Sequence, residues 1–101
     1  MVLEIAQIEI KEGMHAEFEA NVGKAAPLFA AAKGCRGIQL QRSLEFPQRY
    51  RLFVKWETVD NHTIDFRGSD DFQAWRRLVG HCFASAPSVE HTTLVLDGFD
   101  R

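Results

Sequence analysis

Residues 37–57 constrain the fold of this 101-residue chain most, because they carry two alternating segments joined by a short turn. Apolar and polar residues alternate in "GIQLQRSLE" (37–45) and again in "YRLFVKWE" (50–57). A period of two is typical of strands that bury one face, and "FPQR" (46–49) reverses the chain between them. These residues predict a β-hairpin, and with it an antiparallel sheet.

A strand and a long helix are predicted before the hairpin. Residues 2–10 alternate loosely and carry aliphatic side chains on both faces, which indicates a strand covered on both sides. Apolar residues then recur at every third or fourth position between 14 and 33, the stripe of an amphipathic helix. Pro27 lies four residues after Gly23, where the missing side chain leaves the backbone room to bend. One kinked helix is therefore expected rather than two.

Two helices and a strand are predicted after the hairpin. The polar residues 60–67 indicate a short helix that ends at Gly68. Ser69 is then placed to cap a longer helix. Residues 85–88 are expected to form a loop, and residues 89–99 the last strand.

The predicted element order, βαββααβ, fits an α+β fold of the ferredoxin-like class, formed by a single domain over residues 1–101. Helices cover one face of the antiparallel sheet in this fold and leave the other face open. Apolar rows on the hairpin, including Leu40 and Leu52, would then be exposed unless a second copy covered them. A homodimer is therefore expected. The other interpretation is that these rows form the core beneath the helices.

Composition and charge argue against several classes of partner. The formal net charge is −2 and no segment is rich in Lys or Arg, so no nucleic-acid partner is expected. No apolar stretch is long enough to span a membrane. The first ten residues lack a basic secretion signal, so we expect a cytoplasmic protein in which Cys35 and Cys82 are reduced.

Two stretches, "WETVDNHTIDFRGSDDFQAW" (56–75) and "HCFASAPSVEH" (81–91), give the chain a family resemblance. Their most specific residues are Trp56, Glu57, Ser69, Phe72 and Trp75, followed by Pro87, Val89, Glu90 and His91. With this element order, the chain resembles the antibiotic biosynthesis monooxygenase family of the dimeric α+β barrel superfamily. The resemblance implies a homodimer whose two sheets face each other in a barrel, with a pocket between sheet and helices in each subunit.

The resemblance also implies oxidation of a quinol-like or polyketide-like substrate without metal or flavin, because the deprotonated substrate itself passes an electron to O₂. An Asn and a Trp of the family's polyketide oxidases correspond to His62 and Phe66 here, and a Tyr corresponds to Phe72. In the haem-degrading branch the Trp position is again Phe66 and the haem-ligand His falls at Arg76, which argues against a haem protein. Neither catalytic set is intact in this sequence.

Oxidising a phenolic ring without a cofactor requires a flat apolar slot, a group that takes the proton and a donor that stabilises the phenolate. We predict His62 as the proton acceptor and His91 as a second polar contact, because histidine titrates near neutral pH. The residues predicted to bind the substrate are Phe66, Phe72, Trp75, Asn61 and Tyr50, with Arg76 as another donor. The structural alternative is a half-exposed His62 and a set of aromatic residues that only fill the core.

A metal site is the other chemical interpretation of the same segment. His62 and Asp65 are three residues apart on one predicted helix, and Asp70 follows. No third histidine stands at a ligand-like spacing, however, and aspartates beside Gly68 and Ser69 are what helix capping requires. The family resemblance, together with these residues, therefore predicts a small monooxygenase with O₂ as co-substrate and no metal or other cofactor. The alternative is a non-catalytic module that binds a small hydrophobic ligand.

Overall fold

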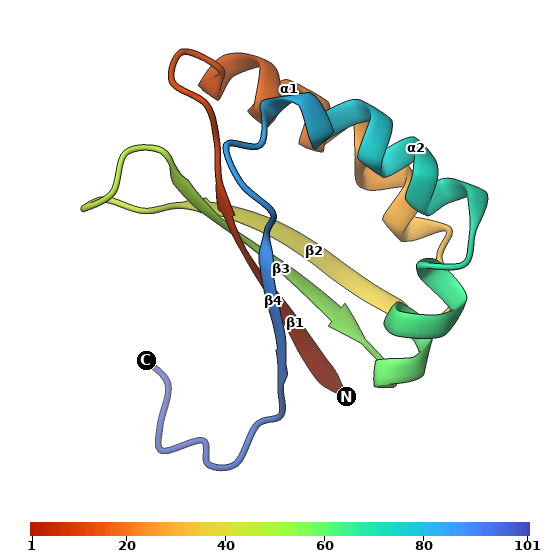
Figure 1. The fold of residues 1–101 in the computed structure, drawn as a ribbon. Coiled ribbons are helices and arrows are strands. Elements are labelled where there is room, and N and C mark those ends of the chain that lie inside the picture. Colours follow the sequence, from red (N-terminus) through yellow and green to blue (C-terminus); the bar gives the residue numbers. More distant parts are fainter.

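The computed structural model describes all residues, 1–101, and its elements follow the predicted order (Figure 1). The strands are β1 (Val2–Glu9), β2 (Cys35–Arg42), β3 (Arg49–Trp56) and β4 (Ser88–Thr92). The helices are α1 (His15–Ala30), the π-helix η1 (Asn61–Phe66), α2 (Asp70–Val79) and the 3₁₀-helix η2 (Gly80–Cys82).

The four strands form one antiparallel sheet in the order β2-β3-β1-β4. Both helices α1 and α2 lie on the same face of this sheet (Figure 1). The α+β, ferredoxin-like fold predicted from the sequence is confirmed. The sheet of the single chain is open, with β2 and β4 as its edges, and does not close into a barrel.

The core lies between the sheet and the helices, and it contains both apolar rows of the hairpin. Leu52 and Val54 of β3 are buried, and their partners in the register, Leu40 and Ile38 of β2, pack against the same core. The rows are therefore the core beneath the helices rather than an exposed patch. The argument that a second copy must cover Leu40 and Leu52 was wrong, because the two strands present these residues to the helix side.

The first helix runs without a break through Pro27 to Ala30, so the prediction of one helix rather than two is confirmed. It ends three residues earlier than predicted. Gly34, with a φ of +77°, turns the chain towards β2. A residue with a side chain is disfavoured in this left-handed conformation, and a Cβ at Gly34 would lie only 2.1 Å from the Asn61 side-chain oxygen.

The second helical region holds two elements, as predicted. The short helix is a π-helix over Asn61–Phe66, a form that is rare and often found at functional sites. Ser69 caps α2 as predicted, because its Oγ accepts a hydrogen bond from the Phe72 backbone N–H at 3.2 Å.

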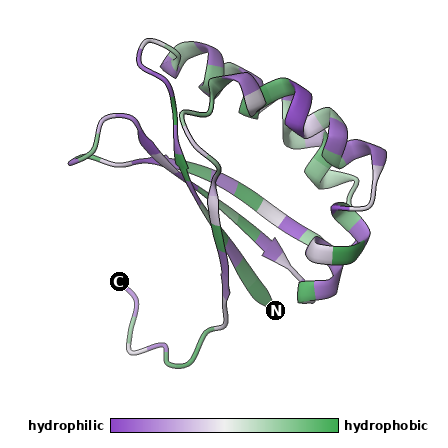
Figure 2. Ribbon diagram, viewed as in Figure 1, coloured by the Kyte–Doolittle hydropathy of each residue, from purple (hydrophilic) through white to green (hydrophobic).

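The last strand stops at Thr92, seven residues short of its predicted end. Thr92 pairs with Leu3, near the beginning of β1, so residues beyond it find no further strand to pair with. Residues 93–101 run away from the sheet (Figure 1), and the hydropathy colouring marks several of them as hydrophobic (Figure 2). The exposed apolar residues of this segment are Leu94, Val95, Leu96 and Phe99. Along the whole chain, no helix has the length and apolar character needed to cross a bilayer.

Candidate active site

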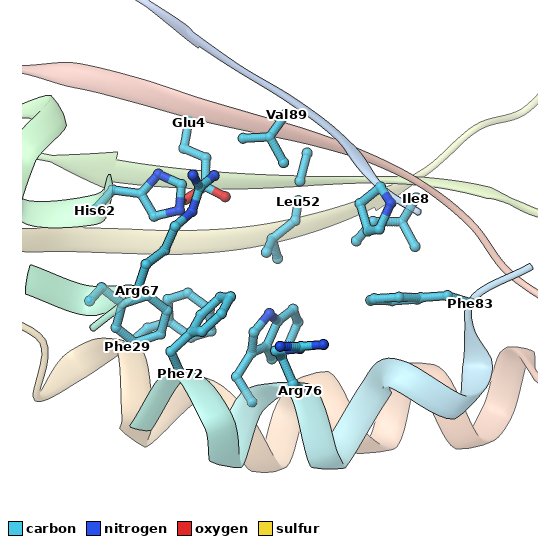
Figure 3. Close-up of a pocket in the computed structure, with 14 residues that line it drawn as sticks. Glu4, Ile8, Phe29, Leu52, His62, Arg67, Phe72, Arg76, Phe83 and Val89 are labelled. Carbon is cyan, nitrogen blue, oxygen red and sulfur yellow. The ribbon is translucent and has the colours of Figure 1, made fainter. Parts of the chain in front are cut away.

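A cavity of about 260 Å³ lies between the sheet and the helices (Figure 3). Its wall is mostly apolar and rich in aromatic rings: Phe29, Phe66, Phe72, Trp75 and Phe83. The lining also includes four residues with polar or charged groups: Glu4, His62, Arg67 and Arg76. A ring-lined space with few polar groups is the usual form of a site for a small organic ligand.

The π-helix holds His62 over this cavity. Thr58 fixes its beginning, because the Thr58 Oγ1 accepts from the Asn61 N–H at 3.1 Å and the Asn61 Oδ1 accepts from the Thr58 N–H at 3.2 Å. The imidazole of His62 is only 3% exposed and stacks on the indole of Trp56, with centroids 5.4 Å apart and planes 16° from parallel. The half-exposed alternative for His62 is therefore wrong.

Glu4 is the buried acid of the site, and it comes from β1. Its Oε1 accepts a hydrogen bond from the Trp56 indole N–H at 2.9 Å and lies 3.3 Å from His62 Nε2. Its Oε2 forms no hydrogen bond within the chain. Every buried side-chain nitrogen and oxygen in the chain has a hydrogen-bond partner, so an oxygen without one, such as Oε2, must be accessible to solvent. Glu4 lines the cavity, which is where a ligand could reach this oxygen.

His91 completes the polar cluster from β4. Glu4 and His91 are direct partners in the β1–β4 register, so the sheet brings His91 to the same place. Its Nε2 lies 2.8 Å from His62 Nδ1, a distance for a hydrogen bond. Glu4, His62 and His91 therefore form one continuous chain of polar contacts that starts at the cavity and ends at a half-buried histidine.

Burial sets the charges of this cluster. Desolvation, together with the charges of Arg67 and His91, lowers the pKa of His62 to about 4. Burial also raises the pKa of Glu4, against the opposing effects of the Trp56 N–H and Arg67. His62 is therefore neutral at pH 7, and its Nε2 lies 3.3 Å from Glu4 Oε1 as a close polar contact rather than an ion pair.

A neutral His62 has one N–H, and its surroundings favour placing it on Nε2. An ionised Glu4 is only an acceptor, so the atom that faces it should donate. His62 Nδ1 then accepts from His91 Nε2. With this tautomer Glu4 Oε1 accepts a hydrogen bond from the Trp56 N–H and faces the His62 N–H at 3.3 Å, while Oε2 is left for a ligand.

Only some of the predicted site residues line the cavity. His62, Phe66, Phe72 and Trp75 line the cavity, whereas His91 reaches it only through His62. Asn61 does not line it: its amide donates to Asp65 at 3.1 Å and its oxygen packs against Gly34.

Tyr50 does not line the cavity either. Its hydroxyl donates to Glu19 Oε2 at 2.5 Å and lies 3.0 Å from His15 Nδ1, both on α1. The reason is geometric, because Tyr50 lies at the opposite end of β3 from Trp56.

The metal interpretation gains no support around His62. Asp65 contacts Asn61 and Lys33 instead of joining His62. A different trio, Glu17, His81 and Cys82, brings its ligand atoms within 4.8 Å of one another outside the cavity. Burial and the neighbouring Glu17 raise the pKa of the Cys82 thiol, which disfavours the thiolate that a metal would need. We interpret this trio as an ion pair between Glu17 and His81 above a buried thiol.

Glu4 and Arg67 are the site residues that sequence reasoning missed. The signal for Glu4 was present: it is a charged residue on the strand face that also carries Ala6 and Ile8, both of which are buried. A carboxylate among core residues is rarely buried without a partner or a function. Arg67 directly follows the π-helix, and nothing in the surrounding sequence distinguishes it from an ordinary solvated cation.

Comparison with known proteins places the chain in a family. The family model for antibiotic biosynthesis monooxygenases matches residues 1–78. The chain belongs to the antibiotic biosynthesis monooxygenase family. Among solved structures, one from Bordetella bronchiseptica assigned to these monooxygenases is 58% identical. That match covers 94% of this chain and 97% of the other, with a TM-score of 0.93.

A protein of known sequence and a second solved structure are also similar to the chain. The uncharacterised Bacillus subtilis protein YczJ is 41% identical over 91 residues, which cover 90% of this chain and 96% of YczJ. SnoaB from Streptomyces nogalater, a cofactor-independent oxygenase, is 16% identical, covers 98% of this chain and 97% of its own, and has a TM-score of 0.81. At that identity the likeness to SnoaB shows the fold alone.

Proposed function

We propose that this family member is a cofactor-independent monooxygenase that acts on a small aromatic substrate of the quinol or polyketide type. One observation carries the proposal: a buried carboxylate, Glu4, has an oxygen without a hydrogen bond in a cavity lined by aromatic rings. The rings would hold a flat substrate and exclude water, and the carboxylate would take its proton.

The Glu4–His62 pair accepts the proton in this proposal, with Glu4 Oε2 as the atom that faces the substrate. A raised pKa makes Glu4 a stronger base than an ordinary carboxylate, which suits proton abstraction from a phenol or an activated ring carbon. The Trp56 N–H donates to the other oxygen, Oε1, and His62 lies 3.3 Å from it, so both residues keep Glu4 in place. His91 contacts the opposite ring nitrogen of His62 at 2.8 Å. His62 and His91 thus keep a role in the site, although His62 is too weak a base to act alone at a pKa of about 4.

The redox balance needs only the substrate and O₂. For a ring CH₂ of the anthrone type, loss of a proton gives a carbanion that transfers an electron to O₂, and the two radicals combine. One oxygen atom becomes the new C=O and the other leaves as water, so all electrons come from the substrate. This chemistry requires no flavin or metal, in line with the description of SnoaB, which shares the fold, as a cofactor-independent oxygenase.

The aromatic walls supply the slot for the ring. Phe66 and Phe72 meet edge to face at 5.7 Å between centroids, and both line the cavity with Trp75. Phe72 stands where the polyketide oxidases have a tyrosine, so no phenol hydroxyl is available at this point. That absence favours the second candidate function, a module that binds a small hydrophobic ligand without turnover.

We also infer a homodimer in the cytoplasm. Leu94, Val95 and Leu96 are 77–91% exposed on the segment after β4, and an exposed apolar patch is a common mark of an interaction surface. Leu3, Ile5 and Phe53 lie half-buried on the open face of the sheet, and Leu3 lines a surface pocket together with that segment. A second copy would cover both. The unpaired Cys35 and Cys82 suit a reducing compartment.

Oxygen uptake by purified, chelator-treated protein tests the function. With a panel of quinols and anthrones, we expect uptake that depends on at least one substrate and that continues without added metal or flavin. Elemental analysis of the active sample should find no stoichiometric transition metal. Binding of the same compounds without any oxygen uptake would replace the monooxygenase by the binding module.

Sedimentation tests the assembly. The wild type should sediment as a dimer at micromolar concentration, and Val95→Asp with Leu96→Asp should give a folded monomer of 11.5 kDa. Leu44→Asp is the matched control, because Leu44 is 94% exposed on the hairpin turn, away from this surface. A wild-type monomer would show that the exposed segment does not mediate self-association.

A further inference from the structure

The cavity contains more positive charge than its own acid can balance. Glu4 is its only acidic lining residue, whereas Arg67 and Arg76 both line it. Neither arginine takes part in any of the ion pairs within the chain. With Glu4 ionised, as the proposed function requires, one positive charge remains without a counter-charge at the cavity.

The two arginines differ in what they can do. Arg67 reaches from the end of the π-helix to the side of Glu4 and His62 (Figure 3), and its charge lowers the pKa of both. Arg67 therefore offsets Glu4. Arg76 rises from α2, on the opposite wall of the cavity, between Phe72 and Phe83 in the same view. Arg76 is therefore the guanidinium that has no counter-charge at the cavity.

The helix itself does not account for the direction of Arg76. Cations in the last turn of a helix interact favourably with its dipole, which explains why both Arg76 and Arg77 occur there. Only Arg76 lines the cavity, however, and Arg77 does not. A guanidinium next to aromatic rings at the edge of an apolar space is suited to a planar anionic group, above all a carboxylate.

We infer that the substrate is an aromatic acid, whose carboxylate binds Arg76 on the helix wall while its oxidisable ring lies against Glu4 and His62 on the sheet wall. This inference rests on the proposed function for the orientation of the ring. The cavity volume of about 260 Å³ falls just below the usual range of roughly 300–1,000 Å³ for ligand pockets. A substrate of one to three fused rings with a single acidic group suits this space, whereas a long polyketide chain does not.

Calorimetric titration with two ligands that cannot be oxidised tests the inference directly. Naphthoate and naphthamide have nearly the same shape and differ in charge. We expect naphthoate to bind the wild type about tenfold more tightly or better, the gain expected of one charge-assisted pair at a partly exposed site. The preference should shrink as salt is added, because Arg76 is an exposed residue.

Variants of the two neighbouring arginines provide the control. Arg76→Ala should lose the preference for naphthoate and bind naphthamide as the wild type does. Arg77→Ala removes the same charge from the next residue, outside the cavity, and should keep the preference. Arg76→Lys should keep part of it. Equal binding of both ligands by the wild type, or a preference that survives in Arg76→Ala, would overturn the inference.

The outcome is separable from the proposed function. If naphthoate is preferred through Arg76 but no quinol or anthrone supports oxygen uptake, the anion site stands and the oxidation does not. If uptake occurs but Arg76→Ala and Arg77→Ala behave alike towards naphthoate, the oxidation stands and the aromatic acid does not.

Discussion

Two polar clusters lie beneath the helices, at opposite ends of the same sheet, and they use nearly the same groups. At one end Glu4, His62 and Trp56 meet; at the other, Glu19, His15 and Tyr50 do. Each cluster thus joins an acid, a histidine and a buried aromatic residue on β3. The first lines a cavity and the second does not.

The two clusters differ in which side-chain oxygens already have hydrogen-bond partners within the chain. The Tyr50 hydroxyl donates to Glu19 and contacts His15, and burial together with Glu19 raises its pKa to about 12. It has nothing left to offer a ligand. Glu4 is held through Oε1 alone, and Oε2 has no partner in the chain. The comparison shows that residue types do not identify the site, whereas an oxygen without a partner beside an apolar cavity does.

Substitution of Glu4 should have the largest effect. Glu4→Gln keeps the shape of the side chain but removes the base, and general-base catalysis typically contributes about 10²- to 10⁴-fold. We therefore expect turnover, measured as oxygen uptake, to fall at least about a hundredfold. In the wild type the rate should rise with pH as Glu4 ionises, above the ordinary carboxyl pKa of 4.5.

Glu90→Gln is the matched control for this comparison. Glu90 pairs with Ile5 on the open face of the sheet and is exposed, so its loss should leave turnover almost unchanged. If Glu4→Gln folds, as judged by circular dichroism, and retains the wild-type rate, Glu4 takes no part in proton transfer and the comparison between the two clusters loses its chemical meaning.

The pH dependence of stability should show a smaller effect, from His62. Its pKa is about 4 in the folded chain and 6.5 when unperturbed, so between these values the unfolded chain binds a proton that the folded chain does not. The free energy of unfolding should therefore fall as the pH drops from 6.5 to about 4, by roughly 3 kcal/mol from this group. Glu4 acts in the opposite sense. Because its pKa is raised in the folded chain, its contribution to stability is lost as the pH rises above 4.5 through the folded-state pKa.

Comparison with His62→Gln isolates the contribution of the imidazole. Denaturant unfolding at several pH values should show wild type and variant converging as the pH falls, because the variant has no imidazole to protonate. An NMR titration reports the same property directly, with the His62 ring signal changing near pH 4. A change between pH 6 and 7 would restore the sequence-based prediction, which assumed an ordinary histidine.

The sequence predicted the fold better than the site, for a physical reason. Alternation, the apolar stripe and the Ser69 cap depend on nearby residues, and each of these predictions is confirmed. The end of β4 was missed because it depends on where its partner β1 begins. Strand periodicity at residues 89–99 cannot show that no neighbour exists.

The site depends on contacts that span the chain. Glu4 and His62 are 58 residues apart in the sequence, and only the β1–β4 register brings His91 to them. His62 was found because it falls at the position of the family's Asn, four residues before Phe66. Tyr50 and Asn61 have suitable groups, but their directions are set by the end of a strand and by Gly34, which no local pattern reveals.

The smallest effect is expected at the closed cluster, from Tyr50→Phe. The variant removes one hydroxyl and leaves Glu19 and His15 near the surface, where water can replace the lost contacts. Stability should therefore fall by only about 1 kcal/mol, the net value of a typical hydrogen bond, and oxygen uptake should be almost unchanged. The ionisation of Tyr50 can be measured directly in the wild type. Tyr50 is the only tyrosine, so the change in ultraviolet absorbance on phenolate formation reports this residue alone, and the phenolate should form only near pH 12 in the folded chain. Because the unperturbed value is 10.0, the unfolded chain ionises first, and the stability due to this group is lost as the pH rises from 10 to about 12. A loss of turnover in Tyr50→Phe as large as in Glu4→Gln would mean that the two clusters act on the same substrate, and that the cavity extends further along β3 than its present lining.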